Sequence, residues 1–250
     1  MKINVVTKGN AVRTNVGSLG ASTVTLIQVD DLNILVDTTH YGRRKLLLEG
    51  LARIDVKPDV VNMVILTHLH WDHALNYDLF PDADFLIASE ELKYNRQLPE
   101  SDLFAVRGFH KLIKEYSVKE VNVARHKITN EVELIKAPGH TPGSLIVFAK
   151  TENESTIITG DAIPNARSWF RGMPDILTYK EASAIRSFEM IKMISNDPII
   201  IPGHDPPFRI IGNTAHYLEK NDLEVIFRED REKDFVFKFG ETESRKNYHT

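Results

Sequence analysis

The sequence predicts an α+β protein, in which runs of β-branched residues alternate with segments of helical periodicity. Three observations support this: short apolar runs that end at polar or glycine-containing turns, apolar residues at helical spacing between them, and a similar order of strands before helix in both halves. The chain has 250 residues, 42% of them hydrophobic and 26% charged, which suffices for one sizeable core. We expect one domain over residues 1–240, followed by a polar, frayed tail over residues 241–250.

The first half of the chain predicts four strands and one helix. β-branched residues predict strands over residues 3–7, 23–29 and 33–37, and Asp30-Asp31 forms the turn between the last two. Leucine and isoleucine at helical spacing predict a helix over residues 42–54. The almost continuous apolar run at residues 60–66 predicts a buried strand.

The second half predicts further strands around two charged or amphipathic helical regions. Residues 90–116 are expected to be mostly helical and to form a lid insertion. A long amphipathic helix is expected to bury the face formed by Ala184, Ile185, Phe188, Ile191 and Ile194. A further helix is expected over residues 214–223. Strands are predicted at residues 84–88, 131–137, 145–149, 155–159 and 199–201, and around Phe235, Phe237 and Phe239.

Composition narrows the class of protein. The chain has no cysteine, so a metal can be bound only through nitrogen and oxygen ligands. The net charge of −4 argues against a nucleic-acid partner, and no segment approaches the ~18 apolar residues of a membrane span. The N-terminus has no signal-peptide core, so we expect a cytoplasmic protein with a small-molecule substrate. The sequence leaves the oligomeric state open.

A dense cluster of metal-binding residue types follows the predicted strand at residues 60–66. Three imidazoles and one carboxylate lie within six residues, in the order His68, His70, Asp72, His73. Such a pattern arises by chance in roughly one chain in a thousand of this composition, so a plain polar loop is the weaker interpretation. His68 and His70 point the same way if the backbone is extended and can bind one metal. A helix starting at Asp72 and His73 would offer those two side chains to a second metal.

Three later strand ends each present one more potential ligand. His140 and His204 each follow a Pro-Gly pair, and Asp161 follows Gly160. Each is weak evidence by itself, because a histidine or a Gly-Asp pair after a strand is more often structural. Together with the first cluster, the five histidines and two aspartates are the right number to hold two divalent ions.

These motifs, in this order, resemble the metallo-β-lactamase superfamily over roughly residues 24–208. The resemblance implies an αββα four-layer sandwich with a two-metal site at one edge of the stacked sheets. It implies that His68, His70 and His140 hold one ion, that Asp72, His73 and His204 hold the other, and that Asp161 bridges them. It also makes Asp37 a candidate acceptor that fixes an imidazole, although a strand-end aspartate that bonds its own turn is an equal alternative.

The implied chemistry is hydrolysis. Two divalent ions about 3.5–4 Å apart acidify a bridging water, and the resulting hydroxide attacks an ester, thioester or lactone bond. Zinc is the expected cofactor, and manganese or iron are alternatives, because imidazole and carboxylate suit all three. Asp72 is the expected catalytic residue, acting both as a ligand and as the group that carries a proton to the leaving group.

The sequence departs from the residue patterns of several subgroups of the superfamily, and these departures narrow the range of possible substrates. Asp161 and the absence of cysteine argue against an antibiotic-degrading enzyme, and the lack of a flavin domain argues against the di-iron flavoproteins. The metal pattern is similar to those of glyoxalase II-like thioesterases and of lactonases. Lactonases carry a tyrosine where this chain has Pro164, and Tyr179 is a possible substitute.

Two regions are candidates for shaping the substrate pocket. The segment 164–175 offers either an aromatic wall with an anion-binding guanidinium or an exposed basic loop, through Arg167, Trp169, Phe170 and Arg171. Aromatic residues expected to pack in the interior are Trp71, Tyr94, Phe104 and Phe109. Three alternatives to an ester, thioester or lactone hydrolase remain: a mononuclear-iron enzyme similar to persulfide dioxygenases, a compact phosphodiesterase or nuclease, and a non-catalytic metal-binding scaffold.

Overall fold

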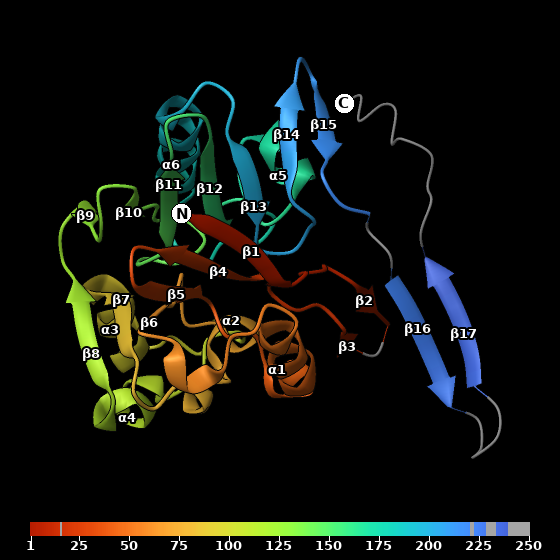
Figure 1. Ribbon diagram of the computed structural model, residues 1–250, viewed down its shortest axis with the longest axis horizontal. Helices are drawn as coiled ribbons and strands as arrows, with labels where there is room; N and C mark the ends of the chain where they lie inside the picture. The colour runs from red at the N-terminus through yellow and green to blue at the C-terminus, as the bar shows by residue number, and fades with distance from the viewer. Residues whose placement is uncertain (16, 221–222, 229–233, 240–250) are drawn as a thin grey trace.

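Two β-sheets are stacked face to face, with helices on the outer face of each (Figure 1). The structure is a computed structural model that describes residues 1–15, 17–220, 223–228 and 234–239. In the first sheet the strand order is β1-β4-β5-β6-β7-β8. These strands are β1 (Lys2–Thr7), β4 (Val24–Val29), β5 (Leu32–Val36), β6 (Met63–Ile65), β7 (Asp84–Ala88) and β8 (Ser117–Val121).

The second sheet has the strand order β15-β14-β13-β12-β11-β10-β9. Its strands are β9 (Arg125–Lys127), β10 (Val132–Lys136), β11 (Leu145–Lys150), β12 (Ser155–Gly160), β13 (Ile199–Pro202), β14 (Phe208–Ile211) and β15 (Thr214–Tyr217). Two small hairpins complete the strands: β2 (Arg13–Thr14) with β3 (Gly17–Ser18), and β16 (Leu223–Arg228) with β17 (Asp234–Phe239). The β16–β17 hairpin lies apart from the two large sheets (Figure 1).

The helices divide between the two outer faces. Those on the first sheet are α1 (Arg44–Ala52), α2 (Trp71–Ala74), α3 (Ser89–Arg96) and α4 (Phe109–Leu112), and those on the second are α5 (Ala166–Arg171) and α6 (Glu181–Ile194). Single 3₁₀ turns lie at Tyr41–Arg43, Pro58–Val60, Tyr77–Leu79 and Ile113–Glu115. No helix in the described part of the chain is long and apolar enough to cross a membrane.

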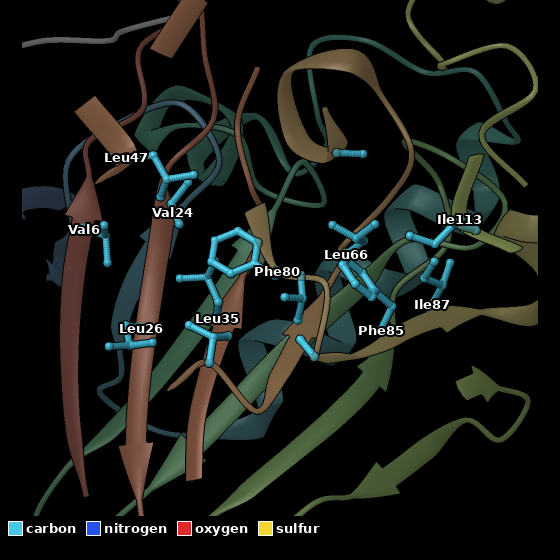
Figure 2. Packing of buried hydrophobic residues seen from close by; sticks show 14 of the residues in the cluster. Val6, Val24, Leu26, Leu35, Leu47, Leu66, Phe80, Phe85, Ile87 and Ile113 are labelled. Atoms are coloured by element: carbon cyan, nitrogen blue, oxygen red, sulfur yellow. The ribbon is translucent and has the colours of Figure 1, made fainter. Parts of the chain in front are cut away.

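Three layers of apolar side chains hold the four layers of secondary structure together. Leu47 of α1 and Leu92 of α3 pack with Leu35 of β5 between the first sheet and its helices, in the cluster that Figure 2 shows in part. A second cluster fills the space between the sheets, and a third joins the second sheet to Phe188 and Ile191 of α6. Neighbouring residues of one strand serve different layers, as their opposite side-chain directions require. The αββα sandwich predicted from the sequence is therefore confirmed.

Parallel pairing brings several strand ends to one edge. Strands β5, β6, β7 and β8 run parallel to one another, and so do β12 and β13. β10 runs in the same direction as β12, because each is antiparallel to β11. The sheets are tied at this edge by the Leu145 N–H, which donates to the Thr67 carbonyl at 2.8 Å, and by the Thr23 N–H, which donates to the Gly203 carbonyl at 2.7 Å. The loops after these strands can therefore form one site.

Two of the predicted helical regions are wrong. The expected helical lid over residues 90–116 is helical only at its two ends, because Gly108 has a left-handed backbone and Asp102 accepts hydrogen bonds from two backbone N–H groups of the segment between. The helix expected over residues 214–223 is absent from its described part, where β15 covers Thr214–Tyr217 and β16 begins at Leu223. A two-residue turn containing Gly212, with φ of 62°, reverses the chain between β14 and β15.

Other predictions are adjusted rather than overturned. The strand expected over residues 60–66 is limited to Met63–Ile65, since a 3₁₀ turn occupies Pro58–Val60. Ile185 lies on the outer face of α6 and is 45% exposed, contrary to the predicted apolar face. The strand predicted around Phe235 is confirmed as β17, and the predicted tail at 241–250 lies outside the described residues.

Candidate metal centre

All seven sequence-predicted ligands lie together at the edge where the strand ends meet. His68 and His70 follow β6, and the short helix α2 carries the two residues after Trp71, as expected. His140 follows β10, Asp161 follows β12 and His204 follows β13. Potential ligand atoms within 4.8 Å of one another occur in three groups: His68, His70 and His140; His68, His73 and Asp161; and Asp72, His73 and His204. We call His68, His70 and His140 the first ligand group, and Asp72, His73 and His204 the second ligand group.

In the first ligand group, two imidazole nitrogen atoms face each other at hydrogen-bond distance. His140 Nδ1 lies 2.8 Å from the carbonyl of Ile176 and must donate to it, which leaves a lone pair on Nε2. That Nε2 lies 2.9 Å from His70 Nδ1, while His70 Nε2 faces Asp102 Oδ2 at 3.6 Å. If His70 carries its proton toward Asp102, two lone pairs face each other, an arrangement that a shared cation stabilises.

The second ligand group combines imidazoles with a carboxylate. His204 Nε2 lies 3.4 Å from Asp72 Oδ2, and His73 Nε2 lies 4.0 Å from the same oxygen. His204 Nδ1 faces the carbonyls of Asn10 and Ala21 at 3.2 and 3.1 Å, so the Nδ1 atom carries the proton and Nε2 faces the site.

Asp161 lies between the two groups. Its Oδ2 is 3.4 Å from His140 Nε2 and 3.2 Å from His204 Nε2, and its Oδ1 is 3.3 Å from His73 Nε2. One carboxylate thus contacts imidazoles of both ligand groups, as a bridging ligand must.

Buried atoms without hydrogen-bond partners test whether a metal fits here. Among the described residues, His68 Nε2, His70 Nε2, His73 Nε2 and Asp161 Oδ1 are buried and make no hydrogen bond. Leaving such atoms unpaired costs roughly 1–3 kcal/mol each. The atoms of His68, His73 and Asp161 lie within 4.8 Å of one another, so bound cations at this place would satisfy all three. The donor set of imidazole nitrogens and carboxylate oxygens suits a divalent ion such as zinc.

Electrostatics differ between the two ligand groups. Burial, together with the neighbouring imidazoles, holds the pKa of His68 well below its usual range, and burial lowers the pKa of His140 to about 4. Burial acts in the same direction on His204, but the Asp161 carboxylate outweighs it and raises the pKa to about 9. The carboxylates of Asp161, Asp37 and Asp72 likewise raise the pKa of His73 well above its usual range against the effect of burial.

Asp37 fixes the orientation of His73, as one of the two sequence-based interpretations required. Its Oδ2 lies 2.8 Å from His73 Nδ1, and its carboxylate also accepts hydrogen bonds from the Thr67 N–H and hydroxyl at 2.8 and 2.9 Å. Asp37 has a φ of 62°, a left-handed backbone that places the side chain back over the loop after β6. His73 Nε2 is thereby directed at Asp161.

Asp102 is a residue that sequence reasoning missed. It is 2% exposed and lies in the segment between α3 and α4, far from the histidine motif in the sequence. Besides facing His70, its carboxylate accepts hydrogen bonds from the Tyr94 hydroxyl at 2.9 Å and from the N–H groups of Phe104 and Ala105 at 2.9 and 3.0 Å. Burial by itself would raise the pKa of Asp102, but His70 and these N–H groups hold it well below its usual range.

Glu91 is a second buried carboxylate that the sequence did not reveal. It accepts hydrogen bonds from the Leu69 N–H at 3.0 Å, the Thr141 hydroxyl at 2.7 Å and the Gly143 N–H at 3.0 Å. Burial raises its pKa. Glu91 therefore ties the loop of His70 to the loop of His140. Neither Asp102 nor Glu91 lies in a motif, so no local signal marks them.

Two glycines allow the strand ends to approach. A Cβ on Gly203 would lie 2.1 Å from Asp161 Oδ1, and one on Gly160, where φ is 47°, would lie 2.7 Å from Thr67 Oγ1. Only glycine leaves room for the Asp161 carboxylate at this place.

The residues expected to shape a pocket have different surroundings. Trp71 is half-buried and its ring contacts His40 at 4.9 Å between centroids, and Phe109 is fully buried as expected. Phe104, expected to pack inside, is 38% exposed and lies 5.7 Å from the His70 ring.

Segment 164–175 offers less to a substrate than the sequence suggested. Trp169 packs on Phe188 of α6, and Arg171 pairs with Asp175 at 2.7 Å. Arg167 and Phe170 are exposed, and so is Tyr179, whose ring lies 5.5 Å from the Lys180 ammonium group.

Comparisons with known sequences agree on one family. The family model described as the metallo-beta-lactamase superfamily matches residues 17–204. The chain is 31% identical over 205 residues to metallo-beta-lactamase domain-containing protein 1 of Xenopus laevis, covering 80% of this chain and 78% of the relative. It is 28% identical over 172 residues to a "probable metallo-hydrolase" of Methanocaldococcus jannaschii, covering 69% and 70% of the two chains.

Solved structures show the same fold. The Bacillus thuringiensis protein AiiA, with N-decanoyl-L-homoserine bound at its active site, superposes with a TM-score of 0.63 at 22% identity, covering 81% of this chain and 89% of AiiA. An N-acyl homoserine lactone hydrolase with the product N-hexanoyl-L-homoserine at its catalytic metal centre also has a TM-score of 0.63, at 21% identity and with the same coverage.

Proposed function

The chain belongs to the metallo-β-lactamase superfamily, and from this premise we propose that it is a hydrolase with a two-metal centre, expected to hold zinc. The substrate we propose is a small molecule with an ester, thioester or lactone bond. The observation that carries the proposal is the convergence of potential ligand side chains from four separate strand ends on one edge of the sandwich, among which His68, His73 and Asp161 have buried atoms without hydrogen-bond partners. A scaffold without a metal would leave these atoms unsatisfied at a considerable cost in stability.

Each ligand group has a role in this proposal. His68, His70 and His140 would hold one ion, Asp72, His73 and His204 the other, and Asp161 would bridge them. Two divalent ions, when bound, supply an acidified water as the nucleophile and an electrophile for the carbonyl oxygen. Asp37 hydrogen-bonds His73 Nδ1 and keeps Nε2 directed at the centre, whereas Asp102 lies 3.6 Å from His70 Nε2, where its negative charge would favour a proton on Nε2 and a lone pair on Nδ1.

Asp72 is the proposed catalytic residue. Its carboxylate is one of the more exposed groups of the cluster, with 13% of the side chain accessible, so a substrate can reach it. Asp72 Oδ2 would accept the proton that the attacking water loses and return it to the leaving oxygen or sulfur. His204 Nε2 lies 3.4 Å from that oxygen, so the two atoms would face the same ion.

The substrate class rests on chemistry shared with relatives. The related lactone hydrolases bind homoserine lactone products at their metal centre or active site, which supports a carboxylic ester or lactone bond as the target. The exposed ring of Phe104 beside His70 offers an apolar surface to the acyl part of a substrate. Pro164 occupies the position of the lactonase tyrosine, so Tyr179 remains a prediction for that role.

Metal analysis combined with activity profiling tests the proposal. The purified protein is loaded with zinc, manganese or iron(II), its metal content is measured, and turnover is assayed on panels of esters, thioesters, lactones and phosphodiesters. We expect two ions per chain and oxygen-independent hydrolysis of a carboxylic ester, thioester or lactone, lost on chelation and restored by metal.

Three other outcomes would each favour a different function. One iron per chain with oxygen consumption indicates an oxygenase. Turnover confined to phosphodiesters indicates a nuclease or phosphodiesterase. Two bound ions without turnover on any panel indicate a metal-binding scaffold.

A further inference from the structure

A cavity of about 280 Å³ lies beside the end of β1, outside the two ligand groups. Backbone of residues 5–10 forms one wall, and helix α1 with the turns at its two ends forms another. The lining includes four charged side chains, three of them basic, namely Lys8, Arg43, Arg53 and Glu219. The chain as a whole carries a net charge of −4, so this concentration of cations is a local feature.

Two guanidinium groups are anchored on the same wall. Arg43 Nη1 donates to the carbonyl of Lys8 at 2.8 Å, and Arg53 Nη2 donates to the carbonyl of Val6 at 3.2 Å. The two carbonyls belong to residues two apart in the chain and both arginines line the cavity, so the two guanidinium groups can flank one anion. Each guanidinium has five N–H donors, and one from each is used in these contacts.

The cations of the cavity are not balanced by acidic side chains. In the described residues no carboxylate lies within ion-pair distance of Arg43 or Arg53, whereas Glu219 lies 3.5 Å from Lys8. Of the three basic side chains in the lining, only Lys8 lies near a carboxylate, so two positive charges have no counter-charge among the described residues. Arg43 is partly buried, so its guanidinium has lost some water without gaining a counter-charge.

We propose that this cavity is a binding site for a small organic oxyanion, a carboxylate or a phosphate, held between Arg43 and Arg53. Guanidinium groups bind such oxyanions through paired N–H donors. Val5 and the 45% exposed Leu46 in the lining provide an apolar surface for a short carbon chain attached to the anion. The site goes beyond hydrolysis, and it does not depend on the proposed function.

One loop connects this site with the metal centre. Asn10 lines the cavity, and its carbonyl lies 3.2 Å from His204 Nδ1. Gly9 packs against Gly203, the residue before His204, so closely that a Cβ on Gly9 would lie 2.2 Å from the Gly203 carbonyl oxygen. An anion in the cavity would therefore lie one loop away from the second ligand group.

Calorimetric titration of the metal-loaded protein tests the site. Inorganic phosphate and succinate are the two probes, and they distinguish a phosphate site from a carboxylate site. Arg43→Gln and Arg53→Gln should each weaken binding of the preferred probe by about tenfold or more, since each removes a charge-assisted contact. Arg44→Gln is the matched control, because Arg44 neighbours Arg43 but pairs with Asp78 through two 2.8 Å hydrogen bonds.

Several outcomes would overturn the proposal. No binding of either probe to the wild type at millimolar concentrations would do so, and so would equal weakening by all three variants, which indicates a general charge effect. Binding that disappears on chelation but is unchanged in Arg43→Gln and Arg53→Gln would place the anion at the metal centre instead. Arg53 is exposed, so Arg53→Gln keeps the test valid if Arg43→Gln fails to fold.

Discussion

The two ligand groups of the candidate metal centre differ in exposure and in charge. In the first group His68 is fully buried, and only 4% and 3% of the side chains of His70 and His140 are accessible. In the second group His73 is also fully buried, but 13% of the Asp72 side chain and 12% of the His204 side chain are accessible. The first group consists of imidazoles alone, whereas the second contains a carboxylate of its own.

This difference in exposure and charge indicates that the two ligand groups have different roles in the proposed centre. Burial keeps His68 and His140 in the neutral form that binds a metal, and it keeps solvent away from that half. The carboxylates around His73 and His204 favour the protonated imidazoles instead, so a metal must displace protons there. We therefore expect the first group to act as a permanent structural anchor and the second as the open half that handles substrate and protons.

The largest effect is expected from Asp72→Asn. An amide keeps the size of the side chain but cannot accept the proton, so kcat should fall by about 10²–10⁴-fold on the preferred ester or lactone. The first ligand group should keep its metal, which metal analysis of the variant checks. Asp78→Asn is the control, because Asp78 is exposed and pairs with Arg44 away from the centre. An Asp72→Asn variant with full activity would remove Asp72 from the mechanism.

The pH dependence of metal binding should separate the two groups. His204 has its pKa raised to about 9, above the ordinary 6.5, and is protonated at neutral pH in the metal-free protein. Affinity at the second group should therefore rise by up to about tenfold per pH unit between pH 7 and 9 for each proton displaced. His140, with its pKa lowered to about 4, is already neutral, so affinity at the first group should change little over this range.

Zinc titrations monitored by calorimetry at several pH values check this prediction, and two binding steps with the same pH dependence would contradict it.

The raised pKa of His204 also predicts how the stability of the metal-free protein depends on pH. The protonated His204 stabilises the fold below pH 6.5, and this contribution is lost as the pH rises through about 9. Urea unfolding of the metal-free wild type and of His204→Gln measures that contribution.

Asp102 and Asp37 should each affect metal binding at only one of the two ligand groups. Asp102→Asn should weaken the first metal-binding step and Asp37→Asn the second, by about 10–100-fold, because each carboxylate fixes the tautomer of one imidazole. Asparagine tolerates the left-handed backbone of Asp37, so the substitution tests charge rather than strain. Competition with a chelator of known affinity gives both constants. If either substitution weakens both steps equally, the two halves are not independent.

Much of the site was predictable because its signals are local. His68, His70, Asp72 and His73 lie in one short run, and the other three ligands follow predicted strands beside a glycine. Each run of β-branched residues predicts a strand, and the end of the run marks the end of that strand. The types of the potential ligands and their order along the chain could therefore be inferred without coordinates. The layer arrangement followed from the resemblance that these motifs carry.

The predictions that failed depend partly on contacts between distant segments. Residues 97–108 leave the helix for a local reason, because Asp102 accepts hydrogen bonds from the N–H groups of Phe104 and Ala105, and for a distant one, because the Trp71 N–H donates to the Phe104 carbonyl at 2.9 Å. Strand β15 forms because β14 provides a partner. Ile185 lies outside the buried face of α6 because the direction of a helix face depends on packing.

The sequence by itself determined the fold class, the residue types that can bind a metal and their order along the chain, because periodicity and motif spacing are properties of neighbouring residues. Only the tertiary structure decided that Asp102 faces His70, that Asp37 faces His73, that Glu91 joins two loops, and that Arg43 and Arg53 line one cavity. Each of these depends on hydrogen bonds or burial between segments far apart in sequence, which the pattern of neighbouring residues does not reveal.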